Sequence, residues 1–412
     1  MKVTLKSDRA SHCRRSRSGL LRYIFPRICR KMAQHHAREG LFSAAFISRT
    51  VSAGVVMTAD HEQRRGIAHD IVQRDVQRDV PHAASPENVI ADLAGRPLFR
   101  NSGIPLDEHW VKDVHVNTSA VERRAQSQVA RRTVKKDWQA AWLLRSITCM
   151  DLTTLSGDDT DERVRRLCAK ARQPIRQDLV EKLGIAELDI KVAAVCVYHT
   201  FIETALHALE GTRIHVAAVS TGFPAGLSPL TERVAEIRRS VEAGAHEIDV
   251  VITRAHVFGG QWQALYDEVA AFKQACGTAH IKVILGTGDL LTLRNVARAS
   301  VVAMMAGADF IKTSTGKEPT NATLPVGLVM TRAIREYAQR TGMAVGFKPA
   351  GGIRTAKQSL DWLAMMKEEL GLSWVRAEMF RFGASGLLGD IERQLEHHVT
   401  GRYSAENRHP LA

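Results

Sequence analysis

Four charged side chains lie within or at the ends of short apolar segments, where a charge is costly to bury. Asp249 falls within 247–252 and Lys282 within 281–285, while Lys312 and Lys348 end the segments 309–312 and 345–348. A single lysine at a strand end is usually solvated, and alternation can point a strand residue outward. In a barrel, however, alternate side chains face a common axis. Four such residues therefore predict one shared, charged site.

Two lysines at neighbouring strand ends indicate a particular chemistry. An amine with an ordinary pKa of about 10 is protonated at neutral pH and is not a nucleophile. Burial, or a second ammonium group close by, lowers that pKa, so that one lysine can attack a carbonyl. The resulting imine is an electron sink for making or breaking a carbon–carbon bond. Asp249 would move protons during these steps.

Loops rich in glycine and hydroxyl side chains follow the late strands. They are Thr313-Ser-Thr-Gly-Lys317, Pro349-Ala-Gly-Gly-Ile-Arg354 and Gly383-Ala-Ser-Gly386. Barrels commonly bind phosphate in the loops after strands seven and eight, through backbone N–H groups and a helix N-terminus. Lys317 would add positive charge there. A glycine pair taken alone indicates only a tight turn.

Strand and helix patterns alternate from residue 147 onward. We predict strands at 147–152, 193–198, 214–219, 247–252, 281–285, 309–312, 344–348 and 378–382. Helical patterns lie between them, for example at 230–243, 262–276, 291–306, 326–340 and 356–370. Eight such units in about 250 residues favour a closed (β/α)8 TIM barrel over an open sheet. No GxGxxG follows the first strand, so a dinucleotide-binding Rossmann fold has no support.

The positive charge of the chain is concentrated near its start. The 412 residues carry a net charge of +13, but the first 60 hold twelve Lys and Arg against Asp8, Glu39 and Asp60. The other 352 residues hold 45 Lys and Arg against 41 acidic residues. A nucleic-acid-binding function would therefore rest on this basic leader alone. No run of 18 uncharged apolar residues occurs, which argues against a membrane-spanning helix.

We expect residues 1–106, the basic leader and a polar linker, to be disordered. The acid-poor, Arg- and Ser-rich segment 1–56 is typical of an organelle transit peptide. It is equally consistent with a disordered basic arm, or with sequence upstream of a working start at Met57. Four prolines between 81 and 105 are typical of a linker.

Residues 107–146 are predicted to form a helical extension packed on the barrel domain, which spans 147–405 and precedes a tail at 406–412. Trp138, Ala141, Trp142 and Arg145 follow helical spacing, which places both tryptophans on one face. We expect that face to contact the barrel.

The cysteines and histidines give no sign of a metal site. The six cysteines are scattered without a CxxC pair, which indicates reduced, intracellular thiols and argues against structural zinc. Cys196 is most simply a small core residue. His199 and His246 have no acidic or cysteine companion at ligand spacing, so we interpret them as turn or surface residues.

Together these motifs resemble the deoxyribose-phosphate aldolase family, in that family's order and over roughly residues 107–405. The longer, animal-type branch is the most similar, as the segments 144–159 and 397–403 indicate. The motifs that carry the resemblance are Asp151-Leu-Thr-Thr-Leu155, Glu247-Ile-Asp-Val-Val251, Phe310-Ile-Lys-Thr-Ser-Thr-Gly-Lys317, Gly346-Phe-Lys-Pro-Ala-Gly-Gly-Ile-Arg354 and Arg381-Phe-Gly-Ala-Ser385.

The resemblance implies a metal-free class I aldolase without a cofactor, which cleaves 2-deoxy-D-ribose 5-phosphate to glyceraldehyde 3-phosphate and acetaldehyde. Lys312 would form the Schiff base, Lys348 would lower its pKa and Asp249 would transfer protons. The resemblance further assigns Asp151 and Thr153 to the substrate hydroxyls and Lys282 to the same site. It assigns the phosphate to loops that contain Gly316, Lys317, Gly351, Gly352 and Ser385.

Two residues depart from the family's pattern. Gly386 stands where a second Ser or Thr is common, so we expect weaker phosphate binding. Gly286 replaces a residue that is commonly larger, and we expect a looser pocket wall there. Neither departure touches Lys312, Lys348 or Asp249.

Two alternatives to this aldolase stay open. One is a barrel lyase that uses the same imine on another phosphorylated aldol. The other is a catalytically silent barrel that acts as a scaffold and binds nucleic acid or acidic partners through its basic arm, although the intact lysines argue against silence. For the aldolase we expect a sugar-phosphate substrate, no membrane or nucleic-acid partner, a homo-oligomeric assembly and a cytoplasmic location, or an organelle if the leader is a transit peptide.

Overall fold

Eight parallel strands form the central sheet, in the order β10-β8-β7-β6-β5-β4-β3-β11. We describe a computed structural model, which covers residues 90–131, 134–405 and 408–409. The strands are short runs of apolar residues, buried almost throughout. They are β3 (Met150–Thr153), β4 (Ala194–Tyr198), β5 (His215–Ser220), β6 (Glu247–Val251), β7 (His280–Ile284), β8 (Phe310–Lys312), β10 (Gly346–Lys348) and β11 (Phe382–Ala384).

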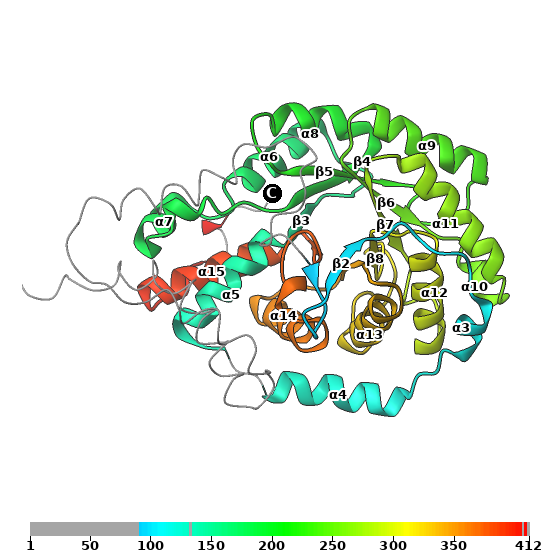
Figure 1. Cartoon of the computed structure of the whole chain (residues 1–412). Helices are drawn as coiled ribbons and strands as arrows, with labels where there is room; N and C mark the ends of the chain where they lie inside the picture. The colour runs from blue at the N-terminus through cyan, green and yellow to red at the C-terminus, as the bar shows by residue number, and fades with distance from the viewer. Residues whose placement is uncertain (1–89, 132–133, 406–407, 410–412) are drawn as a thin grey trace, which may run out of the picture. The chain divides into compact units, whose positions relative to one another are not determined.

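The sheet closes between its two edge strands. Phe347 forms a parallel bridge with Phe380, and Ala350 forms another with Gly383. Helices surround the strands (Figure 1), as the sequence predicts for a (β/α)8 barrel. The carboxyl ends of all eight strands therefore lie at one face, which is the face that carries the active site in such barrels.

The helices begin and end at residues suited to those positions. The side chains of Thr160, Thr292, Thr323 and Thr355 each accept a backbone N–H at a helix start. The long helices are α4 (Thr118–Arg131), α5 (Lys136–Thr148), α6 (Asp161–Arg172), α9 (Leu230–Glu242), α11 (Trp262–Cys276), α12 (Leu293–Met305), α13 (Leu324–Thr341), α14 (Ala356–Leu370) and α15 (Leu387–Thr400). The shorter ones are α3 (Glu108–Asp113), α7 (Gln177–Leu183), α8 (Ile202–Ala208) and α10 (Arg254–Phe258).

The first and last predicted strands are displaced from the observed ones. Residues 147–148, predicted as strand, belong to the end of α5, and β3 begins at Met150. The segment 378–382 was predicted as strand, but the backbone N–H groups of Met379 and Phe380 both donate to the carbonyl of Arg376. This turn delays β11 to Phe382, so only one residue of the predicted strand lies in it.

The helix α5 packs against the barrel helices through a face that includes only part of the predicted one. Its buried residues include Ala140, Leu143, Leu144 and Ile147, while Trp138 is 37% exposed. The small and aliphatic side chains allow α5 to lie close to α14 and α15, which it contacts. The spacing of the tryptophans correctly indicated a helix. Of the predicted face, Ala141 is buried and Trp142 packs against the core, whereas Trp138 does not.

Residues 90–106 are ordered, so the predicted disorder of the whole segment 1–106 is wrong for this part. Strand β1 (Ile90–Ala91) pairs with β2 (Pro97–Arg100), and β2 pairs in parallel with β9 (Met343–Ala344), just before β10. Arg100 Nε donates to Asp309 Oδ1 at 2.8 Å, immediately before β8. Proline is tolerated at the start of a strand, which is where Pro97 lies. Residues 1–89, including the basic leader, lie outside the described residues.

Asn101 holds this N-terminal segment on the barrel and gives a test of its importance. Its buried amide donates to the carbonyls of Met304 (2.8 Å) and Ala308 (2.9 Å) and accepts from the Tyr337 hydroxyl (2.9 Å). We expect Asn101→Ala to lower the free energy of unfolding by about 2 kcal/mol, because buried polar groups lose their partners. Urea denaturation would measure this, with the exposed neighbour Ser102→Ala as a nearly silent control.

The tail predicted at 406–412 returns to the barrel where the structure describes it. His409 is buried, with Nε2 at 2.6 Å from Ser404 Oγ and 3.0 Å from Glu396 Oε2. Because Glu396 belongs to α15, this contact packs His409 against the barrel domain. None of the helices within the described ranges is both long and apolar enough to cross a membrane.

Candidate active site

Seven ionisable side chains meet inside the barrel, and we call them the buried charge cluster. Each is at most 4% exposed, so every charge depends on its neighbours for compensation. The register places Asp249 opposite Lys282 and Lys312 opposite Lys348 on paired strands. The cluster consists of Asp151, Glu247, Asp249, Lys282, Lys312, Lys348 and Arg381.

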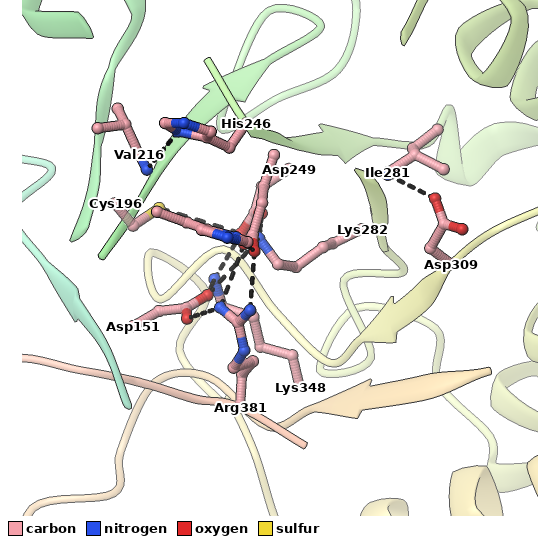
Figure 2. Close-up of polar contacts among 12 residues, drawn as sticks. Asp151, Cys196, Val216, His246, Asp249, Ile281, Lys282, Asp309, Lys348 and Arg381 are labelled. Carbon is pink, nitrogen blue, oxygen red and sulfur yellow. Dashed lines mark hydrogen bonds and ion pairs between the residues drawn. The ribbon is translucent and has the colours of Figure 1, made fainter. Parts of the chain in front are cut away.

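Asp249 is the hub of the three lysines. Its Oδ2 accepts from Lys312 Nζ at 2.8 Å and from Lys348 Nζ at 2.7 Å, while Oδ1 accepts from Lys282 Nζ at 2.8 Å. Lys312 and Lys348 thus share one carboxylate oxygen, which brings their nitrogens close together. Figure 2 shows the side chains of Lys282 and Lys348 directed toward Asp249 from different strands.

Asp151 and Glu247 form the rest of the anionic part. Asp151 Oδ2 accepts from Lys348 Nζ at 2.5 Å, and Glu247 Oε2 lies 2.5 Å from Lys282 Nζ. The Arg381 guanidinium joins the two carboxylates, at 2.5 Å from Asp151 Oδ1 and 2.7 Å from Glu247 Oε1. Gly383 leaves room for this arrangement, since a Cβ atom there would lie 3.3 Å from Lys348 Cε and 2.7 Å from the Ala350 Cβ.

The carboxylates of the cluster stay ionised despite their burial. Burial alone would raise the pKa of Asp249, but Lys282, Lys312 and Lys348 hold it well below its usual value. Burial likewise opposes ionisation of Glu247, but Arg381 and Lys282 keep its pKa low. The pKa of Asp151 is kept low against burial by Lys348 and Arg381.

The three lysines are not equivalent. Burial lowers the pKa of Lys312, and the neighbouring Lys348 lowers it further, although Asp249 acts in the opposite direction. For Lys348 the effect of burial is outweighed by Asp151 and Asp249, which raise its pKa. Asp249 and Glu247 similarly outweigh burial and raise the pKa of Lys282. Of the three lysines, Lys312 is therefore the one whose surroundings favour the neutral amine, which is the form that can act as a nucleophile.

An apolar wall faces this charge across the inside of the barrel. Leu155, Cys196, Ala217 and Val219 pack together there, with Tyr198 and Phe223 beside them. Burial raises the pKa of the Cys196 thiol, and its Sγ lies 4.0 Å from Asp249 Oδ2. Cys196 thus forms part of a neutral wall near Lys312 and Asp249, as its interpretation as a small core residue predicts.

Comparison with known proteins decides the family. Residues 145–388 match the model of the DeoC/LacD family of aldolases. The chain belongs to this aldolase family. The human protein named deoxyribose-phosphate aldolase is 58% identical over 314 residues, which are 76% of this chain and 99% of the relative. The mouse protein of that name is 60% identical over 312 residues, 75% of this chain and 98% of the relative.

Solved structures agree with the fold of a DeoC/LacD aldolase. A structure from Toxoplasma gondii has a TM-score of 0.55 at 22% identity, and covers 67% of this chain and all of that one. At this identity the likeness concerns the fold alone.

In this DeoC/LacD aldolase, the residues predicted to bind substrate occupy two regions. Asp151 and Lys282 belong to the buried charge cluster, and the half-buried Thr153 donates its hydroxyl to the Asp151 carbonyl at 2.8 Å. The predicted phosphate loops come together at the carboxyl ends of β8, β10 and β11. Gly351 connects them, because its amide donates to the carbonyl of Gly383 and a Cβ there would overlap Asn321. Gly316, Lys317, Gly352 and Ser385 are exposed in these loops.

The loop after β8 contains an acidic residue that the sequence analysis did not consider. The carboxylate of Glu318 accepts from the backbone N–H of Thr315 at 2.9 Å and of Gly316 at 3.1 Å, and from the Thr315 hydroxyl at 2.8 Å. The Gly316 N–H assigned to phosphate is thus bound to an internal carboxylate. Lys317 follows directly and is exposed.

The two departures from the family pattern have different surroundings. A Cβ atom at Gly286 would lie 2.9 Å from Arg254 Cδ, so the Arg254 side chain lies against this position. The looser pocket wall stays a prediction. Gly386 has open space around its Cα and lies just before α15.

The two histidines considered in the sequence lie at the surface. His199 is exposed, as expected of a turn residue. His246 is also exposed at the start of β6, with its ring stacked on that of His215.

Glu247 and Arg381 are members of the cluster to which the sequence analysis gave no role. Glu247 precedes Asp249 by two residues, so both side chains point to the same face of β6. This two-residue spacing in the sequence could have identified Glu247 as a residue that points into the barrel with Asp249. Arg381 lies just before β11, and the displaced prediction of this strand concealed its inward direction.

Proposed function

We propose that this chain is a class I deoxyribose-phosphate aldolase that cleaves 2-deoxy-D-ribose 5-phosphate reversibly through an imine on Lys312. One observation carries the proposal: Lys312 and Lys348 share one carboxylate oxygen of Asp249 inside a buried cluster. Burial and the neighbouring Lys348 lower the pKa of Lys312 there. Membership in the aldolase family and the names of its human and mouse relatives support the choice of substrate.

The neutral amine of Lys312 attacks the aldehyde carbon of the open-chain sugar, and loss of water gives the iminium ion. Removal of the proton from the C3 hydroxyl then breaks the C2–C3 bond, with the bonding electrons moving into the iminium. Glyceraldehyde 3-phosphate leaves, and an enamine of acetaldehyde remains on Lys312. Protonation of the enamine and hydrolysis of the imine release acetaldehyde. The imine itself is the electron sink, so these steps use no metal or organic cofactor.

Asp249 and Lys348 are the groups proposed to move protons in these steps. The Asp249 carboxylate contacts both lysine nitrogens, which positions it to accept a proton from one and return it to the substrate. Lys348 is the adjacent charged donor. Asp151 and Thr153 are proposed to bind the substrate hydroxyls, and Lys282 to hold Asp249 in place.

The proposed phosphate site is formed by the three loops above β8, β10 and β11. Backbone N–H groups of Gly352 and Ser385 and the N-terminus of α15 supply neutral donors, and Lys317 supplies a charge. Gly351 holds the loops together, because its own N–H donates to the carbonyl of Gly383. Gly316 contributes to this site when phosphate shares or replaces the contact of its amide with Glu318.

Removing the charge of Lys317 tests this phosphate site. We expect Lys317→Ala to raise KM for deoxyribose 5-phosphate about tenfold, with a much smaller effect on free deoxyribose, because one charge-assisted contact to phosphate is lost. Steady-state kinetics on both sugars would measure the difference. Lys182→Ala, at an exposed lysine of α7, is the control and should leave both KM values unchanged. Equal loss for both sugars would place Lys317 outside a phosphate site.

The imine can be tested directly by reduction with borohydride in the presence of acetaldehyde. Peptide mass spectrometry should then find an ethyl group on Lys312 and leave the other lysines unmodified. Folded protein that gives no adduct on any lysine would contradict the proposed mechanism.

We also propose a cytoplasmic location. The described cysteines Cys149, Cys168, Cys196 and Cys276 are free and buried, which supports a reducing compartment. A homo-oligomeric assembly stays a prediction, which light scattering of the purified protein would test.

A further inference from the structure

Arg381 and Glu247 form an ion pair within the buried charge cluster. The guanidinium contacts Glu247 through both of its terminal nitrogens, at 2.7 Å and 3.2 Å. Each reaches Lys312 through other residues of the cluster. Arg381 contacts Asp151, which contacts Lys348, and Glu247 contacts Lys282, which contacts Asp249. Figure 2 shows Arg381 directed toward Asp151 beside Lys348.

The charges of the cluster do not cancel. Lys282, Lys312, Lys348 and Arg381 supply four positive charges, against three negative charges from Asp151, Glu247 and Asp249. With all seven ionised, one positive charge stays uncompensated in a region shielded from water, which is unfavourable. Loss of one proton from Lys312 makes the cluster neutral.

We propose that Arg381 and Glu247 are positioning residues that set the charge balance of the cluster, and through it the protonation state of Lys312. This inference rests on the proposed function, because it concerns the lysine that forms the imine. Neither residue needs to touch the substrate. Without Arg381, the three lysines and three carboxylates would be neutral together, so Arg381 gives the cluster its net positive charge. Without Glu247, that net charge would be +2 instead of +1.

The groups around Lys312 define what else could control it. Lys312 pairs directly with Asp249 of β6. Lys348 of β10 and Cys196 of β4 lie close enough to influence its charge. The remaining charged groups reach it through these neighbours: Asp151 of β3, Lys282 of β7, Glu247 of β6 and Arg381, which precedes β11. His215 of β5 approaches Glu247, with Nδ1 at 2.7 Å from Oε1, and is partly exposed.

The proposal predicts shifts of opposite sign for the two residues. Arg381→Met removes a positive charge, so Lys312 keeps its proton to higher pH and the acidic limb of the activity profile moves to higher pH. Glu247→Gln removes a negative charge, so Lys312 loses its proton more easily and the limb moves to lower pH. We expect each shift to be about 1 pH unit or more, as for a charge change within a buried cluster.

The pH dependence of kcat/KM for deoxyribose 5-phosphate measures these shifts, because it reports the ionisation of the free enzyme. Reductive trapping of acetaldehyde on Lys312 across the same pH range gives an independent midpoint. The double variant Arg381→Met/Glu247→Gln restores the charge balance, and its midpoint should return close to that of the unchanged protein. Arg381→Lys keeps the charge and should keep the midpoint.

A purely structural role gives a different result. Loss of packing would lower activity in both single variants without moving their midpoints in opposite directions. Midpoints that stay in place, or that move the same way in both variants, would overturn the proposal. If Arg381→Met does not fold, Glu247→Gln and Arg381→Lys decide it, since only the first should shift. A failure of the proposed function is separately visible, because the unchanged protein would then form no adduct on Lys312.

Discussion

Lys312→Ala should abolish turnover of deoxyribose 5-phosphate, with a loss of roughly 10⁴-fold or more, because the covalent route depends on this amine. The same variant should give no adduct with acetaldehyde and borohydride. The reason is structural as well as chemical: the pKa values of Lys282 and Lys348 are raised, so neither supplies a neutral amine in place of Lys312. Steady-state kinetics and peptide mass spectrometry measure the two effects.

Lys312→Arg is the matched control for the loss of charge. The guanidinium keeps a positive group beside Asp249 but forms no imine, so this variant should be as inactive as Lys312→Ala while the folded state is better preserved. Circular dichroism would confirm folding in both. Substantial activity in either variant would rule out Lys312 as the Schiff-base residue.

Lys348→Leu should move the acidic limb of the pH profile to higher pH and lower the maximal rate by roughly 10²- to 10⁴-fold. The sign follows from the contacts. Lys348 and burial together lower the pKa of Lys312, so removing the ammonium group raises that pKa and a higher pH is needed for the neutral amine. The fall in rate reflects the loss of a group placed 2.7 Å from Asp249, the residue proposed to transfer protons.

Lys273→Leu controls for the removal of any ion-paired lysine. Lys273 Nζ lies 2.8 Å from Asp309 Oδ2, which is outside the buried charge cluster. This variant should keep both the pH profile and the maximal rate. An unchanged profile in Lys348→Leu would contradict the role of Lys348 in tuning Lys312, even if its activity fell.

The barrel could be predicted from the sequence because most of its strands have the same local signature. Segments such as 193–198 and 281–285 are short and apolar, and they are bounded by helical patterns of unambiguous period. The last strand was displaced because a turn at Arg376 is set by backbone hydrogen bonds that its residue types do not reveal. The segment 90–106 was missed for a related reason: its order comes from pairing with β9, about 240 residues later in the chain.

The residues of the candidate site also fall into two groups, those that the sequence predicts and those that it does not. Lys312, Lys348 and Asp249 could be found because charged residues in apolar strands are unusual, and their convergence followed from the barrel. The contact of Glu318 with the Gly316 amide depends on the path of one loop, and no spacing rule predicts it. The charge excess of the cluster required knowledge of which side chains point inward, including that of Arg381 just before a displaced strand.

The N-terminal sheet also has a practical consequence for shortened forms of the protein. Strand β2 lies between β1 and β9 in the three-stranded sheet. A protein beginning at Asp107 would lack both β1 and β2, and the backbone of Met343–Ala344 would become an open edge that can pair with another molecule. Such a protein would keep every residue of the proposed chemistry, yet its useful lifetime in solution would be set by aggregation. A start at or before Ile90 keeps this edge covered.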